Sequence, residues 1–228
     1  MRNEFVKLEL HLTSFYEEKK MKKILSLESP VTKWLTLFTN LVLLNTLFLL
    51  TSLPIVSIGA ALTALATGCQ RILRGNNEHI IQHYFKDFKE NAQQSTYLWG
   101  FIVALTTLLI VDFLFFLRQG MVVRYIACLG LAMLCIVILL LLSVGFSYIG
   151  RYQDSFRQVL RNSLLLAMGN PLWMWCILGF AIIVAYGSVS SPERLLTSIY
   201  VNTFGGCAVI AFVNAYFVKQ LFDKIEKR

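Results

Sequence analysis

Charged residues are scarce in this chain, and their scarcity excludes an ordinary water-soluble domain. Only 15% of the residues are Asp, Glu, Lys or Arg, whereas 57% are hydrophobic. Soluble globular proteins carry roughly 25% charged and about 45–50% apolar residues. The 228 residues also include only 4 prolines and 13 glycines, which excludes collagen-like and low-complexity sequence. With a mean hydropathy of +0.63, the composition predicts an integral membrane protein that lies in a lipid bilayer.

Chemistry-bearing motifs are also missing. The chain has 5 cysteines, an odd number, and no C-x-x-C spacing. Cys128 and Cys135 lie seven residues apart on one helix face, where we expect them to pack as small side chains. There is no Gly-rich phosphate loop, no nucleophile elbow and no pair of carboxylates within an apolar run. We therefore predict neither an enzyme nor a bound cofactor.

Six hydrophobic runs approach the roughly 20 residues that a helix needs to cross a bilayer. They are residues 34–53, 55–73, 97–117, 125–148, 171–186 and 195–218. Lipid cannot satisfy backbone hydrogen bonds, and no alternating barrel pattern is present. The predicted fold class is therefore an all-α, polytopic membrane helix bundle. Residues 1–33 and 219–228 are predicted to be cytoplasmic, and Met21 offers an alternative translation start that would make residues 1–20 an upstream extension.

Pro54 decides how the first two runs are threaded. Either residues 34–68 form one broken span and the chain crosses five times, or Pro54 marks a hairpin and the chain crosses six times. Lys and Arg accumulate in cytoplasmic loops. With six crossings and the N-terminus inside, only Arg118, Arg124 and Arg194 lie outside, and the other 18 of the 21 basic residues lie inside. Five crossings divide them 10 to 11. We predict six crossings with both termini cytoplasmic, which explains the net charge of +8 without nucleic acid.

Polar side chains within the spans are candidate contacts. Asp112 is the one carboxylate in a span, and burying it near the bilayer centre costs about 2.5–3.5 kcal/mol. It contacts an ion, a proton or a substrate, or it is a structural partner of Arg118 or Asn202; we expect the structural role. A second group, expected to donate hydrogen bonds to a neighbouring helix, shares one face of the first span: Thr36, Thr39 and Asn40.

Residues 78–91, in a predicted cytoplasmic loop, have an amphipathic pattern. The apolar positions are Ile80, Ile81, Tyr84, Phe85 and Phe88. This spacing predicts a helix at the membrane interface or against the bundle. The opposite, polar face carries a candidate set of metal ligands at successive turns: His79, His83 and Asp87. The glutamate of the zinc-protease signature is missing and we expect this face to be solvated, so we predict no metal site.

Two further patterns concern packing. Small residues at i, i+4 and i+8 (Ala60, Ala64 and Gly68) predict that the second helix pairs closely with the first. A basic amphipathic stretch at residues 156–166 leads into the fifth span, and Asn170 and Pro171 interrupt the helix there.

Several short stretches form a specific pattern. The strongest is Ser52–Leu65, which contains Pro54, Gly59, Ala60 and Ala64. The others are Phe85–Asn91, which contains Phe88, together with Leu27–Pro30, Asn40–Asn45, Gln94 and Trp99. In these residues the chain resembles the YesL-like family of bacterial membrane proteins of unknown function. The resemblance implies a plasma-membrane protein of Gram-positive type bacteria, often encoded beside carbohydrate-uptake transporters. It implies no known reaction and no established binding residues.

Three functions remain open. We expect a non-enzymatic accessory or regulatory partner of subunits of an ABC-type sugar transporter, an expectation that rests on the family context. The alternative is a small solute transporter or channel, which the interruptions at Pro54 and Pro171 favour and the shortage of inward polar groups disfavours. A membrane sensor that signals through residues 78–91 is the third.

Overall fold

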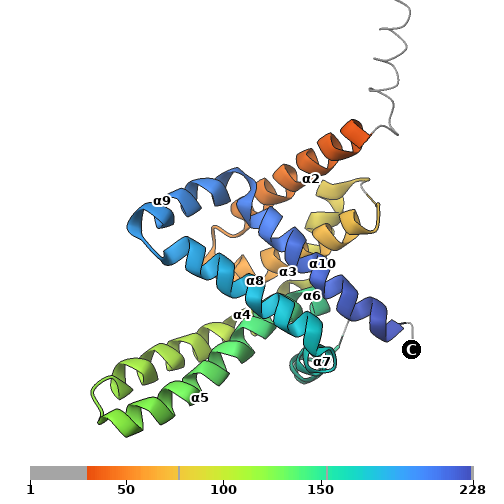
Figure 1. The fold of residues 1–228 in the computed structure, drawn as a ribbon. Coiled ribbons are helices and arrows are strands. Elements are labelled where there is room, and N and C mark those ends of the chain that lie inside the picture. The colour runs from red at the N-terminus through yellow and green to blue at the C-terminus, as the bar shows by residue number, and fades with distance from the viewer. Residues whose placement is uncertain (1–29, 77, 153, 227–228) are drawn as a thin grey trace, which may run out of the picture. The chain divides into compact units, whose positions relative to one another are not determined.

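The computed structural model describes residues 30–76, 78–152 and 154–226, and every regular element in these residues is a helix (Figure 1). In chain order the elements are α2 (Pro30–Thr51), η1 (Ile55–Ser57), α3 (Ile58–Leu73), α4 (Ile80–Phe116), α5 (Met121–Leu140), η2 (Leu141–Gly145), α6 (Phe146–Ile149), α7 (Phe156–Met168), α8 (Pro171–Val189), α9 (Pro192–Val201), η3 (Asn202–Gly206) and α10 (Cys207–Glu226). The predictions for residues 1–29, including the alternative start at Met21, lie outside the described residues.

Six helices within the described residues are long and apolar enough to cross a membrane. They are Pro30–Thr51, Ile55–Leu73, Ile80–Phe116, Met121–Ile149, Pro171–Val189 and Pro192–Lys224. Each contains or closely matches one predicted span, so the all-α membrane bundle is confirmed. The last of them comprises α9, η3 and most of α10, and α10 continues to Glu226, through most of the predicted tail.

The chain divides into two compact units, residues 1–40 and residues 41–228. In the first unit, the Thr36 hydroxyl donates to the Thr32 carbonyl at 2.8 Å, and the Thr39 hydroxyl donates to the Leu35 carbonyl at 2.9 Å. These hydroxyls therefore bond within their own helix and not to a neighbouring one as predicted, because the carbonyl four residues earlier is always within reach. Asn40 is buried, and its amide nitrogen has no hydrogen-bond partner among the described residues.

The chain breaks and turns back at Pro54. α2 ends at Thr51 and the short 3-10 turn η1 begins directly after the proline. The Ser57 hydroxyl donates to the carbonyls of Thr51, at 2.6 Å, and Pro54, at 2.8 Å. Past the turn, a Cβ on Gly68 would lie 2.8 Å from Leu44. Since Leu44 and Gly68 lie at similar distances along the chain on either side of the turn, α2 and α3 run antiparallel here, and the predicted hairpin is confirmed.

Small residues allow α3 to pack closely on both α2 and α4. The predicted stripe is buried at all three positions: Ala60, Ala64 and Gly68. Of these two neighbours α4 approaches more closely, because a Cβ on Gly59 would lie 2.3 Å from the Ser95 carbonyl oxygen. The buried hydroxyls of Thr63 and Ser95 share a hydrogen bond of 2.7 Å at the same interface. α3 is thus held by close backbone contact and a polar link, both of which stabilise helix pairs in lipid.

α4 is one continuous helix, so the amphipathic segment predicted at residues 78–91 is its first part and not a separate helix. Tyr84 and Asp87 are buried there, whereas Ile81 and Phe85 are 47% and 42% exposed. The side of the helix that faces the bundle therefore overlaps the predicted apolar face only in part: it includes Tyr84, and it includes Asp87 from the predicted polar face. Polar partners explain the difference: the Tyr84 hydroxyl is 2.7 Å from that of Thr51, and Asp87 pairs with an arginine of α3.

Two predicted spans contain π-helical turns that hydropathy alone does not indicate. η2 interrupts the helix between α5 and α6, and η3 interrupts the helix between α9 and α10. Gly205, in η3, has a φ of 146°, which side-chain-bearing residues rarely adopt. The predicted break at Asn170 and Pro171 is present, since α7 ends at Met168 and α8 begins at Pro171.

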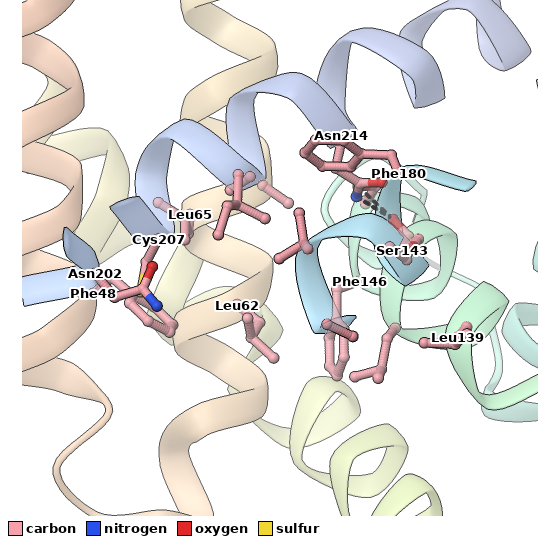
Figure 2. Close-up of a pocket in the computed structure, with 18 residues that line it drawn as sticks. Phe48, Leu62, Leu65, Leu139, Ser143, Phe146, Phe180, Asn202, Cys207 and Asn214 are labelled. Carbon is pink, nitrogen blue, oxygen red and sulfur yellow. Dashed lines mark hydrogen bonds between the residues drawn. The ribbon is translucent and has the colours of Figure 1, made fainter. Parts of the chain in front are cut away.

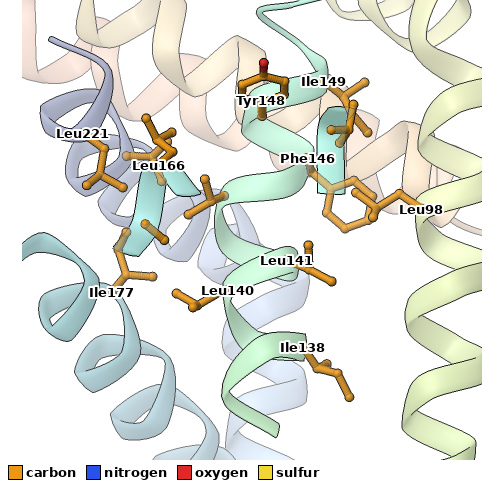
Figure 3. Close-up of a cluster of buried hydrophobic side chains, with 14 of the residues drawn as sticks. Leu98, Ile138, Leu140, Leu141, Phe146, Tyr148, Ile149, Leu166, Ile177 and Leu221 are labelled. Atoms are coloured by element: carbon orange, nitrogen blue, oxygen red, sulfur yellow. The ribbon is translucent and has the colours of Figure 1, made fainter. Parts of the chain in front are cut away.

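The main apolar cluster lies where the helices after α3 meet. Figure 3 shows Leu98 of α4 near Phe146 of α6, and Ile177 of α8 on the other side of the interrupted helix. These side chains are at most 2% exposed. The cluster fixes the helix that carries η2 in the middle of the second unit.

α4 and α5 lie side by side in Figure 1, and both expose apolar side chains. Leu114 is 57% exposed and Met133 is 72% exposed. Such a surface suits contact with lipid tails and would be unfavourable in water. Cys128 and Cys135 lie on this exposed surface as free thiols, so they do not pack in the bundle as predicted.

Candidate functional site

A cavity of about 380 Å³ lies among α2, α3, α8 and the two interrupted helices (Figure 2). Most of its lining is apolar and includes three phenylalanines: Phe48, Phe146 and Phe180. Small-molecule sites in proteins have volumes of about 300–1,000 Å³ and are mostly apolar, with a few polar groups that fix the ligand's orientation. The cavity has the size and the character of such a site.

The polar lining comes mainly from the interrupted helices. Figure 2 shows Asn214 of α10 facing Ser143 of η2, where the Asn214 side-chain NH₂ donates to the Ser143 carbonyl at 2.9 Å. The Ser147 hydroxyl donates to the same carbonyl at 3.3 Å. Side chains therefore satisfy a backbone acceptor at the π turn. Among the described residues that line the cavity, none is charged, so the cavity suits an uncharged molecule.

Asn45 of α2 supports the second interruption. Its NH₂ donates to the carbonyls of Asn202, at 3.0 Å, and Thr203, at 3.1 Å, and its oxygen accepts from the Ala208 amide at 3.1 Å. The Asn45 side chain is 1% exposed. Unsatisfied backbone groups cost several kcal/mol in lipid, so this one amide makes the break at η3 tolerable.

The structure brings only one of the predicted intramembrane contacts into the cavity. Asn202 lines it, and the Asn202 amide donates to the Ser198 hydroxyl at 3.3 Å. Asp112 lies half-buried on α4, and neither ion pair recorded among the described residues includes it. The expected pairing of Asp112 with Arg118 or Asn202 is not observed, and the role of Asp112 stays a prediction.

Asp87 faces α3 and not the two histidines. Arg71 Nη2 lies 2.9 Å from Asp87 Oδ1 and 3.1 Å from Oδ2, and Asp87 is only 6% exposed, so the polar face predicted to be solvated is in part buried. The part of the chain that the structure describes contains no cluster of three His, Cys, Asp or Glu side chains that could hold a metal.

The environment of Asp87 changes its acidity. Asp87 lies on α4 before the apolar half of that helix, residues 97–116. Burial raises the pKa of its carboxyl, and the charges of Arg71 and His83 lower that pKa in part.

Sequence reasoning missed three residues that build the cavity region: Asn45, Ser143 and Asn214. Two features of the sequence could have indicated these residues and the interrupted helix. Asn45 and Asn214 are amides within apolar runs, where polar groups need partners, and Gly205 and Gly206 are adjacent glycines within the last span, a common site of helix kinks.

Residues 41–113 match a protein family described as "Protein of unknown function, DUF624". Comparison with curated proteins and with solved structures gives no match. The family match spans Pro54, Gly59 and the α2 and α3 walls of the cavity, and it ends before η2, α8 and α10. The chain is thus similar to this uncharacterised family from Leu41 in α2 to Phe113 in α4.

Proposed function

We propose that this protein is a non-enzymatic, multi-pass membrane protein that binds an uncharged, mostly apolar molecule in the cavity between its two interrupted helices. The size and lining of the cavity support this proposal most directly. Its volume is about 380 Å³, no described lining residue is charged, and Ser143, Asn202 and Asn214 supply the polar groups. A ligand with one or two hydrogen-bonding groups on an apolar body fits this lining.

The interruptions themselves support a binding role. A π turn is less favourable than continuous α-helix, and such turns are frequent at functional sites. Here both π turns border the same cavity, and the side chains of Asn45 and Asn214 stabilise them. A free sugar is a poor ligand for this site, because its many hydroxyls need more partners than the lining offers.

The resemblance to YesL-like proteins supports a cellular role. In this role the protein is an accessory or regulatory partner of a carbohydrate-uptake system of the ABC type in the bacterial plasma membrane. The cavity ligand is then a regulator and not the transported sugar. The distribution of Lys and Arg supports cytoplasmic termini.

A small solute transporter or channel is the second candidate. The same two interrupted helices favour it, since broken helices often border transport sites. The absence of a charged side chain among the described lining residues counts against coupling to an ion gradient.

Filling the cavity tests the binding role. Ala211 lines the cavity on α10, and Val209, nearby on the same helix, is 50% exposed. Native mass spectrometry of wild-type protein extracted from membranes in lipid discs should detect a retained small molecule. Ala211→Phe should lose it, and the matched control Val209→Phe should keep it. Equal retention in all three proteins would refute the binding role.

Crosslinking in native membranes separates the two cellular roles. The accessory role requires that transporter subunits are captured with the wild-type chain. Purified protein that moves a solute across liposomes without any partner would instead support the transporter. Capture of no transporter subunit would contradict the accessory role.

External labelling of engineered cysteines tests the orientation. Ser190, in the turn between α8 and α9, should react with an impermeant reagent in intact cells, and Asn76, between α3 and α4, should react only after the membrane is opened. Labelling of Asn76 in intact cells would reject cytoplasmic termini with six crossings.

A further inference from the structure

The cavity between the interrupted helices lies at the depth of the hydrocarbon core of the bilayer. Each of its 18 lining residues belongs to one of the six helices that are long and apolar enough to cross a membrane. Asn202 and Asn214, for example, both lie well inside the last span, Pro192–Lys224. The surroundings of the cavity are therefore lipid tails and not water.

The cavity is also open at its side. Among the described residues that line it, only Leu65, Phe146 and Ser147 are fully buried, and Ala185 of α8 is exposed. The other lining residues are half-buried. A molecule dissolved in the bilayer can therefore enter sideways, whereas a polar solute would first have to leave water and cross the lipid tails, which is unfavourable.

The shape of the cavity suits an extended chain. Cys207 and Asn214 of α10 both line it, and the helix between them rises about 10 Å, roughly a third of the hydrocarbon thickness of a bilayer. Figure 2 shows Cys207 and Asn202 at one end of the lining and Asn214 with Ser143 at the other. A segment of an acyl or isoprenoid chain can lie between these two ends.

One end of the cavity offers hydrogen-bonding groups to a ligand. The Asn214 NH₂ donates to the Ser143 carbonyl. Among the described residues, however, the Asn214 side-chain oxygen and the Ser143 hydroxyl have no hydrogen-bond partner. Together these groups can accept one hydrogen bond and donate another, which is what one alcohol group requires. A carboxylate or phosphate would bring a charge that no described lining residue compensates.

We propose that the cavity binds a lipid alcohol, an uncharged lipid that enters from the bilayer, places its hydroxyl between Asn214 and Ser143 and extends its chain toward Cys207. This inference rests on the binding role proposed above and specifies the class of ligand. Of the lining residues on α10, Asn214 is the nearest in sequence to Lys219, the first charged residue after it. The hydroxyl therefore lies toward one membrane surface, as the head of a lipid does. Two lipids share this chemistry: diacylglycerol and polyprenol.

Fluorescence quenching in phosphatidylcholine discs tests the proposal. The reporter is Phe180→Trp, in the cavity, and the matched control is Met133→Trp, on α5, where Met133 is 72% exposed. Both carry phenylalanine at the 4 natural tryptophan positions. With a brominated lipid alcohol as a small fraction of the lipid, Phe180→Trp should lose most of its fluorescence. Met133→Trp should lose only the share that the bulk lipid concentration sets.

Two probes separate the two lipids. Preferential quenching of Phe180→Trp by brominated diacylglycerol supports a glyceride, and preferential quenching by brominated polyprenol supports an isoprenoid alcohol. Equal quenching of both reporters by both probes would overturn the proposal. If wild-type protein still retains a small molecule that Ala211→Phe loses, that result rejects only the lipid alcohol and leaves the binding role intact. If no small molecule is retained either, the binding role fails with it.

Ser143→Ala in the reporter protein tests the contact with the hydroxyl. It removes a group that has no partner among the described residues of the unbound protein, so stability without the lipid should not change. The brominated lipid alcohol should bind about three- to tenfold more weakly, the loss expected from one hydrogen bond. The matched control, Thr107→Val, removes an exposed hydroxyl that donates to the Val103 carbonyl at 2.9 Å and should leave binding unchanged. Equal affinity of the two variants would contradict the placement of the hydroxyl at Ser143.

Discussion

Replacing Asn45 by leucine tests whether one side chain makes the break in the last helix tolerable. Leucine has nearly the shape of asparagine but forms no hydrogen bonds. Asn45→Leu therefore removes the bonds to the carbonyls of Asn202 and Thr203 and the bond from the Ala208 amide. Because Asn45 is 1% exposed, water does not replace them readily.

The expected magnitude follows from these three bonds. A side-chain hydrogen bond in a membrane protein contributes about 0.6 kcal/mol on average and at most about 1.7 kcal/mol. Losing three lowers the free energy of unfolding by about 2 kcal/mol, and by up to about 5 kcal/mol if all three backbone groups stay unpaired. A loss of about 2 kcal/mol lowers the folding equilibrium constant about 30-fold.

Reversible unfolding in mixed micelles with increasing sodium dodecyl sulfate measures this change. Thr46→Val is the matched control, because the exposed Thr46 hydroxyl donates, among the described residues, only to the Val42 carbonyl of its own helix, at 3.0 Å. We expect the control to change stability by less than about 0.5 kcal/mol. If Asn45→Leu unfolds at the same midpoint as the wild type and the control, Asn45 does not stabilise the interrupted helix.

Two further variants probe the packing of α3. Gly59→Ala should destabilise the protein by about 1–3 kcal/mol, because its Cβ would meet the Ser95 carbonyl, and Gly100→Ala, with open space at its Cβ, should change stability by less than about 1 kcal/mol. Equal stability of the two in micelles would contradict the close approach. Arg71→Met should lose about 1.5–3 kcal/mol at neutral pH, because it leaves the Asp87 carboxylate buried without a cation. Burial already raises the pKa of Asp87, so the folded variant takes up a proton more readily than the unfolded chain, and its stability should recover as pH falls toward about 4. A pH profile parallel to that of the wild type would contradict this.

The membrane bundle and its first turn could be predicted from the sequence because the physical causes are local. Long apolar runs are stable in the hydrocarbon core of a bilayer, and Pro54 has no amide hydrogen to continue a helix. The break before Pro171 follows from the same property. In each case the information lies within a few residues of the feature.

The cavity could not be predicted because its causes lie far apart in the chain. The break at η3 depends on Asn45, which is separated from Ala208 by 163 positions in the sequence. No local pattern shows that this amide and that backbone meet. The burial of Asp87 could not be predicted for a related reason. The spacing along one helix places this carboxylate on a polar face, whereas Arg71, on another helix, allows it to be buried.

A high-resolution cryo-EM map of the protein, isolated from its own membrane in lipid discs without detergent, would show whether the cavity holds a ligand. We expect ordered density between Phe48, Phe180 and Asn214, with both π turns present, and loss of that density in Ala211→Phe. A map in which side chains close the space and the helices run straight through η2 and η3 would contradict a ligand-binding cavity.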